Sequence, residues 1–128
     1  KESEMREALF RHISFFQKLP SLHTESSPED GPNSRKITVN DAEWSEVKQA
    51  VNDAFNNFVD RLRENYPQLS EKDICFCCLV KINVNIQDLS DIYCVSKAAI
   101  TKRKYRIKTE KMHISDETLS LDTILQSF

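Results

Sequence analysis

The chain has 128 residues, a length that accommodates one ordinary domain, or a small domain with an accessory segment, and excludes two large domains. Hydrophobic residues make up 39% and charged residues 30%, and no apolar run is long enough to span a bilayer. The single glycine, Gly31, argues against Gly-rich phosphate loops, tight hairpins and a β-sandwich, so composition predicts an all-α fold. The sequence starts at Lys1 without a methionine or a signal-peptide pattern, so we expect it to be part of a longer protein.

The formal net charge of −2 is unevenly distributed along the chain. Residues 97–111 hold seven basic residues and one acid, Glu110, which gives this segment +6. The other eleven basic and nineteen acidic residues leave the rest of the chain at −8. A positive segment on an acidic body predicts a localised anion-binding face, with a solvated charged helix as the alternative.

Residues 1–19 are predicted to form a coiled-coil-like helix with a heptad seam. The seam positions recur at alternating steps of four and three: Met5, Leu9, His12, Phe16 and Leu19. Pro20 ends this helix, and residues 20–39, rich in proline and serine, are predicted to be a polar, disordered linker. His12 is interpreted as a packing or partner-contact residue, because no second metal ligand stands beside it.

A long amphipathic helix is predicted between Asn40 and Pro67. The Asn40 side chain can cap its start, and Glu43, three residues on, completes a capping box. Its apolar stripe comprises Trp44, Val47, Val51, Ala54, Phe55, Phe58, Leu62 and Tyr66. We interpret this stripe as core rather than as a ligand cage, because aromatic side chains at helical spacing usually pack inside.

Three of the four cysteines fall within the sequence DICFCCLV, which opens a choice between a metal site, a redox site and hydrophobic packing. A capping-box signature at Ser70 and Asp73 predicts a helix over residues 71–82. On that helix Cys77 points roughly 160° away from Cys75, so the three thiols cannot bind one ion, and a disulfide within one turn would strain the helix. We therefore predict free thiols packed in a core-facing stripe of Ile74, Cys77, Cys78 and Ile82.

Residues 86–112 are predicted to form two helices joined by a tight turn. The first helix covers residues 86–93, and Ser96 caps a second helix that runs to about Met112. Ile100, Lys104 and Ile107 lie on the inward face of the second helix, where Lys104 must extend its charge to solvent. This arrangement is typical of a helix-turn-helix unit, whose second helix, about 97–111, enters the DNA major groove.

Candidate DNA contacts follow the outward face of that second helix. Lys102 can donate to guanine, Thr101 can bond a base or touch a thymine methyl, and Tyr105 can stack or donate. The small side chains of Ala98 and Ala99 let the helix approach closely. The predicted phosphate contacts are Ser96, Lys97, Arg103, Arg106 and Lys108.

Residues 66–112 read YPQLSEKDICFCCLVKINVNIQDLSDIYCVSKAAITKRKYRIKTEKM. This run resembles the LuxR/GerE-type helix-turn-helix domain, a winged-helix-like bundle whose pattern is approximately LTxxExxxLxLxxxGxxxxEIAxxLxISxxTVxxHxxxIxxKL. The positions that match are Leu69-Ser70 at LT, Asp73 at the first acid, Asp88-Leu89-Ser90 at EIA, Val95-Ser96 at IS, Ala99-Ile100 at TV, and Ile107 at the later apolar position. The departures are Asn83 or Val84 for glycine, Ser90 for alanine, Ala99 for threonine and Arg103 for histidine.

The flanking segments carry a second resemblance. Trp44, Phe58, Arg61-Leu62 and Tyr66-Pro67 fit a helix of the form W...F..RL...YP.L, and residues 120–128 fit a tail of the form SLD..L.SF. The chain is thus similar to the C-terminal part of tetratricopeptide-repeat transcriptional regulators of Bacteroides-like bacteria. This resemblance implies a parent with N-terminal helical repeats, sometimes a membrane span and a coiled coil, and a DNA-binding output.

The function predicted is that of a DNA-binding output domain of a bacterial transcriptional regulator. It would bind double-stranded DNA as a homodimer, with RNA polymerase as a further partner, and the dimer contact is open among residues 1–19, the Trp44 helix and residues 121–128. The alternative is a protein-protein interaction module without direct DNA binding, whose basic face meets an acidic surface.

Catalysis and cofactor binding are not expected of this chain. No nucleophile-base-acid spacing, paired carboxylates or nucleotide loop occurs, and the three histidines are scattered, so we predict a non-enzyme without cofactor or metal. The free thiols favour a reducing compartment, so a cytoplasmic location is predicted, with a membrane-anchored parent left open.

Overall fold

The computed structural model describes residues 39–128, so the helix predicted at 1–19 and nearly all of the linker predicted at 20–39 lie outside the described residues. Within the described range the chain forms α2 (Asp41–Ala54), α3 (Phe58–Asn65), α4 (Glu71–Lys81), α5 (Ile86–Tyr93), α6 (Lys97–Arg106), a π-helical turn η3 (Ile107–Lys111) and α7 (Leu121–Gln126). No strand occurs in this range, which confirms the all-α prediction. None of these helices is long and apolar enough to cross a bilayer.

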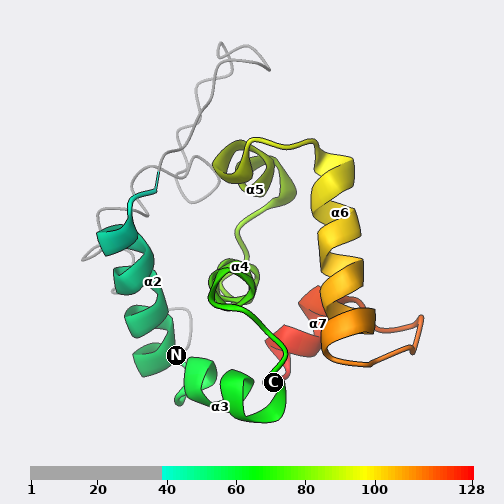
Figure 1. The fold of residues 1–128 in the computed structure, drawn as a ribbon, viewed down its shortest axis with the longest axis horizontal. Coiled ribbons are helices and arrows are strands. Elements are labelled where there is room, and N and C mark those ends of the chain that lie inside the picture. Colours follow the sequence, from blue (N-terminus) through cyan, green and yellow to red (C-terminus); the bar gives the residue numbers. More distant parts are fainter. Residues whose placement is uncertain (1–38) are drawn as a thin grey trace.

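Helix α4 lies at the centre of the bundle, and the other helices surround it (Figure 1). Its residues from Asp73 to Lys81 are all buried, because the sequence ICFCCLV presents apolar side chains on every side of the helix. The cysteines of this run are free thiols, and burial raises the pKa of Cys77 to about 12. The prediction of hydrophobic packing is therefore confirmed for Cys77 and Cys78, which are fully buried.

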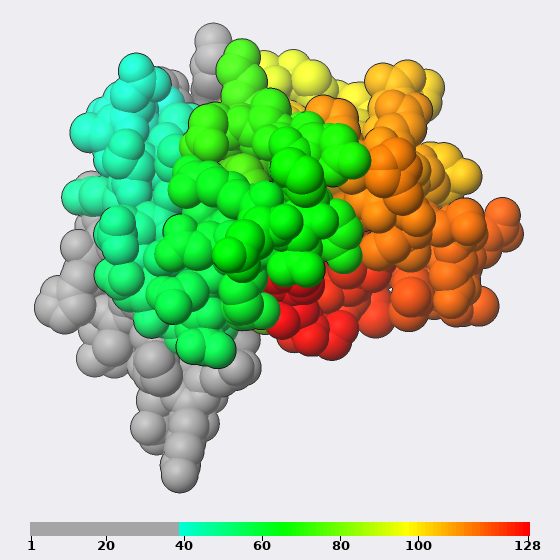
Figure 2. All heavy atoms as spheres, turned by 60° about the horizontal axis from the view of Figure 1, so that its bottom comes forward, coloured from blue at the N-terminus to red at the C-terminus, as the bar shows by residue number. Residues whose placement is uncertain are grey.

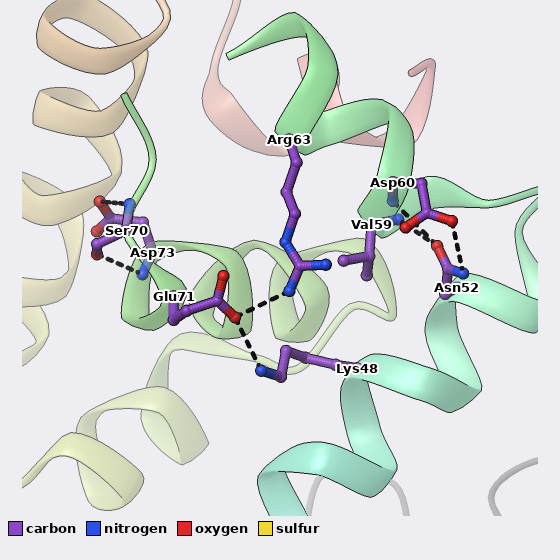
Figure 3. A network of polar contacts seen from close by, with 8 residues as sticks. All are labelled: Lys48, Asn52, Val59, Asp60, Arg63, Ser70, Glu71 and Asp73. Atoms are coloured by element: carbon purple, nitrogen blue, oxygen red, sulfur yellow. Dashed lines mark hydrogen bonds and ion pairs between the residues drawn. The ribbon is translucent and has the colours of Figure 1, made fainter. Parts of the chain in front are cut away.

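The starts of α2 and α4 carry the capping boxes that the sequence predicts. Asn40 Oδ1 accepts from the Glu43 amide at 2.8 Å, and the Glu43 carboxylate accepts from the Asn40 amide at 3.1 Å. Ser70 and Asp73 make the same reciprocal pair at the start of α4, with both distances 3.1 Å (Figure 3). Both capping boxes are confirmed, and they satisfy amide groups that a helix start leaves without partners.

The single long helix predicted between Asn40 and Pro67 is wrong, because the structure divides it into α2 and α3. Asn56 and Asn57 both have φ of 59°, a left-handed conformation that asparagine tolerates better than most residues. The Asn52 side chain then caps α3 from the preceding helix, since its Oδ1 accepts from the amides of Val59 at 2.9 Å and Asp60 at 3.1 Å (Figure 3).

Helix α7 closes the bundle against the end of α4, and Figure 2 shows its red atoms between the green and orange segments of the chain. Leu121 and Leu125 are buried in the common core. Lys81 Nζ donates to the carbonyls of Leu125 at 3.0 Å and Gln126 at 3.2 Å. Gln126 Nε2 donates in return to the Lys81 carbonyl at 2.9 Å, so the two helix ends satisfy each other's backbone groups.

Candidate nucleic-acid interface

Helices α5 and α6 are joined by the three-residue turn that the sequence predicts. Cys94 has φ of 56° and ψ of 45°, a left-handed geometry that ends α5, and the Val95 amide donates to the Ser90 carbonyl at 3.1 Å. Ser96 begins the next helix, because its Oγ accepts from the Ala99 amide at 3.1 Å. The turn therefore fixes where α6 starts relative to α5.

The outward face of α6 is exposed and positively charged. Its exposed side chains are Lys97, Ala98, Ala99, Thr101, Lys102, Tyr105 and Arg106. Tyr105 is 56% exposed, which is high for a large aromatic side chain. The structure thus places Thr101, Lys102 and Tyr105, the predicted base contacts, on one accessible surface with Lys97 and Arg106.

The inward face of α6 packs as predicted. Ile100 and Ile107 are buried with 1% and 2% exposure. Lys104 lies between them along the helix and extends to the Asp122 carboxylate of α7, with Nζ and Oδ1 3.0 Å apart. Its charge is satisfied at the edge of the core rather than in the open solvent.

The placement of Lys108 on the outward face is wrong, because its side chain is buried. Its Nζ donates to the carbonyls of Asp116 and Leu119, each at 2.9 Å. Lys108 follows Lys104 by four residues, a spacing that puts both on one face of a helix. The Met112 amide also donates to the Ile107 carbonyl five residues earlier, at 2.9 Å, which makes the end of this helix a π turn.

Arg103 is only partly exposed, and its side chain also makes contacts inside the bundle. Its guanidinium stacks over the rings of Phe76 and Tyr93, 4.6 Å and 5.0 Å from their centroids. Its Nη2 lies 3.5 Å from the Asp73 carboxylate. The side chain therefore connects α6 to α4 and α5. Its role as a phosphate contact stays a prediction, whereas the buried Lys108 does not belong to that set.

Asp73, predicted from the sequence to cap α4, also binds two basic side chains of residues 97–111. Its Oδ2 accepts from Lys111 Nζ at 2.9 Å, and its Oδ1 faces Arg103. Burial alone would raise the pKa of Asp73, but hydrogen bonds from Lys111 and Ser70 lower it below its ordinary value. This carboxylate holds the middle and the C-terminal end of the basic segment 97–111 against α4, across sequence separations that no local pattern reveals.

Searches against protein-family models, curated proteins and solved structures found no match to this chain. The similarity to LuxR/GerE domains therefore stays a prediction made from residues 66–112. Among residues 39–128, no group of three or more His, Cys, Asp or Glu side chains lies close enough to hold a metal ion. What the surface can bind must be argued from its own charge and shape.

Proposed function

We propose that the chain is a DNA-binding domain of a transcriptional regulator and that α6 enters the major groove of double-stranded DNA. One observation carries this proposal: the outward face of α6 presents Lys97, Lys102 and Arg106 with no acid among its exposed residues, directly after a three-residue turn. An α-helix fits the width of the major groove, and a second helix after such a turn is the element that enters it.

Charge distribution supports an orientation as well as an affinity. The segment 97–111 has +6, while the rest of the chain has −8. DNA phosphates attract the positive segment 97–111 and repel the acidic remainder of the chain, so the domain would approach DNA with α6 foremost. Three lysines of this segment already have partners within the molecule. Lys104 pairs with Asp122, Lys108 donates to backbone carbonyls, and Lys111 pairs with Asp73. The cations left for DNA are those on the outward face.

The roles of the exposed side chains divide by chemistry. Thr101, Lys102 and Tyr105 are assigned to base edges, since Lys donates to guanine acceptors and Thr can contact a thymine methyl. Lys97 and Arg106 are assigned to phosphates, and the Ser96 hydroxyl can donate to a phosphate while its oxygen still caps α6. The small Ala98 leaves room between these groups for the groove edge.

One copy of α6 reads too few base pairs to define a unique genomic site. Helix-turn-helix proteins meet this requirement by binding two half-sites about 34 Å apart as dimers. We propose that this domain acts as a homodimer on a two-part site, with RNA polymerase as a partner of the bound complex.

The test is binding of fluorescent duplexes at several salt concentrations, after selection of preferred sequences from a random pool. Lys102→Ala should reduce discrimination between the selected duplex and a scrambled one, because it removes a base contact. Lys97→Ala should weaken both duplexes alike and lower the salt slope by about 0.9, the value for one phosphate contact.

Arg63→Ala is the matched control, because it removes an arginine on α3 that is paired with Glu71 and lies outside the proposed interface. This variant should bind both duplexes as the wild type does. A wild-type chain indifferent to every duplex at low salt would reject the proposal and favour the protein-protein interaction module instead.

A further inference from the structure

A cavity of about 570 Å³ lies among α2, α4, α5 and α6, away from the outward face of α6. Its volume falls within the range of small-molecule sites, about 300 to 1,000 Å³. The residues that define its chemistry are Trp44, Lys48, Lys72, Cys75, Tyr93 and Arg103. Four helices contribute to it, which is typical of a site between the helices of a bundle.

One side of the cavity is aromatic and apolar. The rings of Trp44 and Tyr93 stack with their centroids 6.1 Å apart and their planes 30° apart. Cys75 adds a thiol, and burial raises the pKa of that thiol, so it stays neutral. A flat ring is the ligand shape that such a surface favours.

The Tyr93 hydroxyl is a buried polar group beside the cavity. Its oxygen is buried and has no hydrogen-bond partner in the part of the chain that the structure describes. A buried hydroxyl without a partner costs free energy, and native proteins leave few of them unexplained. This hydroxyl has almost no solvent-accessible surface, so it lies beneath the cavity lining and does not itself decide which ligand the cavity takes.

The cationic groups adjoin this aromatic surface, since the Arg103 guanidinium lies 5.0 Å from the centroid of the Tyr93 ring. Arg103 carries five N–H donors, yet its contacts to the Lys72 carbonyl and the Asp73 carboxylate are long, at 3.4 Å and 3.5 Å. Lys72 itself is exposed and makes no ion pair within residues 39–128. Most of the donor capacity of these two side chains is therefore available to an anion.

The carboxylates that line the cavity offset this charge only in part. Glu71 is already bound by Lys48 and Arg63, each 2.9 Å from the same oxygen (Figure 3). Asp41, at the start of α2, is the second acid of the lining. With Lys48 neutralised by Glu71, Arg103 and Lys72 outnumber the one remaining acid.

We propose that this cavity binds a small aromatic carboxylate. The ring lies against Trp44 and Tyr93, and the carboxylate binds Arg103, with Lys72 adding a second positive charge. This inference concerns binding by the chain on its own and does not depend on DNA binding, so each proposal can fail without the other.

Trp44 makes the test direct, because it is the only tryptophan in the sequence. Phenylacetate should quench its fluorescence in the full 128-residue chain saturably, with a Kd below about 1 mM. Phenylacetamide, which has the same ring without the charge, should bind about tenfold more weakly. Amide resonances of Cys75 and Tyr93 should shift with the same saturation curve.

Arg103→Gln and Arg63→Gln form the matched pair of variants. Arg103→Gln removes the charge together with the stacking on Tyr93, so it should weaken phenylacetate binding about tenfold more than it weakens phenylacetamide binding. Arg63→Gln removes an arginine outside the cavity lining and should change neither affinity. Absence of saturable binding, equal affinity for acid and amide, or shifts confined to residues outside the cavity would overturn the proposal.

Discussion

The carboxylate of Asp73 connects the start of α4 to the end of the basic helix. It accepts from the Ser70 amide at 3.1 Å and from Lys111 at 2.9 Å, and its side chain is only 12% exposed. Asp73→Asn should lower the free energy of unfolding by about 1 to 2 kcal/mol at neutral pH, since Lys111 is itself partly exposed and its pairing is screened. Urea unfolding measures this, and Asp53→Asn, an exposed acid on α2, is the control.

The difference in unfolding free energy between wild type and Asp73→Asn should decrease as the pH falls. The pKa of Asp73 is lower in the folded chain than its ordinary value of about 3.9, so folding favours the ionised form. Its contribution is complete above about pH 4 and is lost as the pH falls through the folded pKa. Wild type and Asp73→Asn should therefore converge in stability in acid. A difference that stays constant from neutral pH down to about pH 2 would contradict this role.

Substitution of Lys108, which is buried, and of Lys102, which is exposed, should have different effects on stability and on DNA binding. Lys108→Met removes donors to two backbone carbonyls and should lower the free energy of unfolding by about 1 to 3 kcal/mol, without changing the salt slope of DNA binding. Lys102→Met alters an exposed side chain that is assigned to a base edge, so it should reduce discrimination between the selected and scrambled duplexes and leave stability within about 0.5 kcal/mol of wild type. Thermal unfolding and duplex titration of both variants give the comparison.

At the scale of elements, the break between α2 and α3 depends on an unusual cap. Asn57, which precedes α3, makes no side-chain cap, and Asn52 on α2 accepts from two amides of α3 instead. Asn52→Ala should cost about 1 to 2 kcal/mol of unfolding free energy, the usual value for losing a cap. Gln49→Ala, one turn earlier on α2, removes only a surface contact to Asp53 and should cost far less. Equal losses in chemical denaturation would argue against the capping role.

The elements also show which parts of the structure local sequence could predict. Caps and turns depend on neighbours in sequence, so the capping boxes and the turn before Ser96 follow from it directly. The break at Asn56 and Asn57 was hidden because Phe55, Phe58 and Leu62 keep helical spacing and are buried on both sides of it.

The candidate site was predictable only where exposure follows from position on a helix. The outward placement of Lys97, Thr101 and Lys102 is confirmed, because residues on one face of a helix share an environment. Arg103 takes partners 30 or more residues away, in α4, which periodicity within α6 cannot indicate. The cavity was missed for the same reason, since four separate helices line it.

At the scale of the whole molecule, charge and packing are arranged around the same helix. The inner side of α6 is tied to α4 through Asp73 and to α7 through Lys104 and Asp122, while its outer side stays accessible. A helix held from behind at several points keeps one orientation, and a preorganised surface loses less entropy on binding. The rigidity of the bundle is thus part of the proposed DNA-binding function.

Helix α7 provides the strictest test of that arrangement. A chain ending at Ser120 loses the buried Leu121 and Leu125, the Asp122 carboxylate, and two carbonyls that accept from Lys81. We expect the free energy of unfolding to fall by about 3 to 5 kcal/mol, because apolar burial is lost and a buried ammonium group loses acceptors. Asp122→Asn alone, which breaks a half-exposed ion pair, should cost less than about 1 kcal/mol.

Combining the shortened chain with Lys81→Met separates the two causes. If the shortened chain is destabilised because the buried ammonium group of Lys81 has lost its acceptors, Lys81→Met should recover part of its stability. The same substitution should destabilise the full chain, in which those acceptors are present. Urea unfolding of the four proteins gives the coupling free energy between Lys81 and α7. A coupling near zero would mean that the hydrogen bonds from Lys81 Nζ to the carbonyls of Leu125 and Gln126 add nothing to the closure of the bundle.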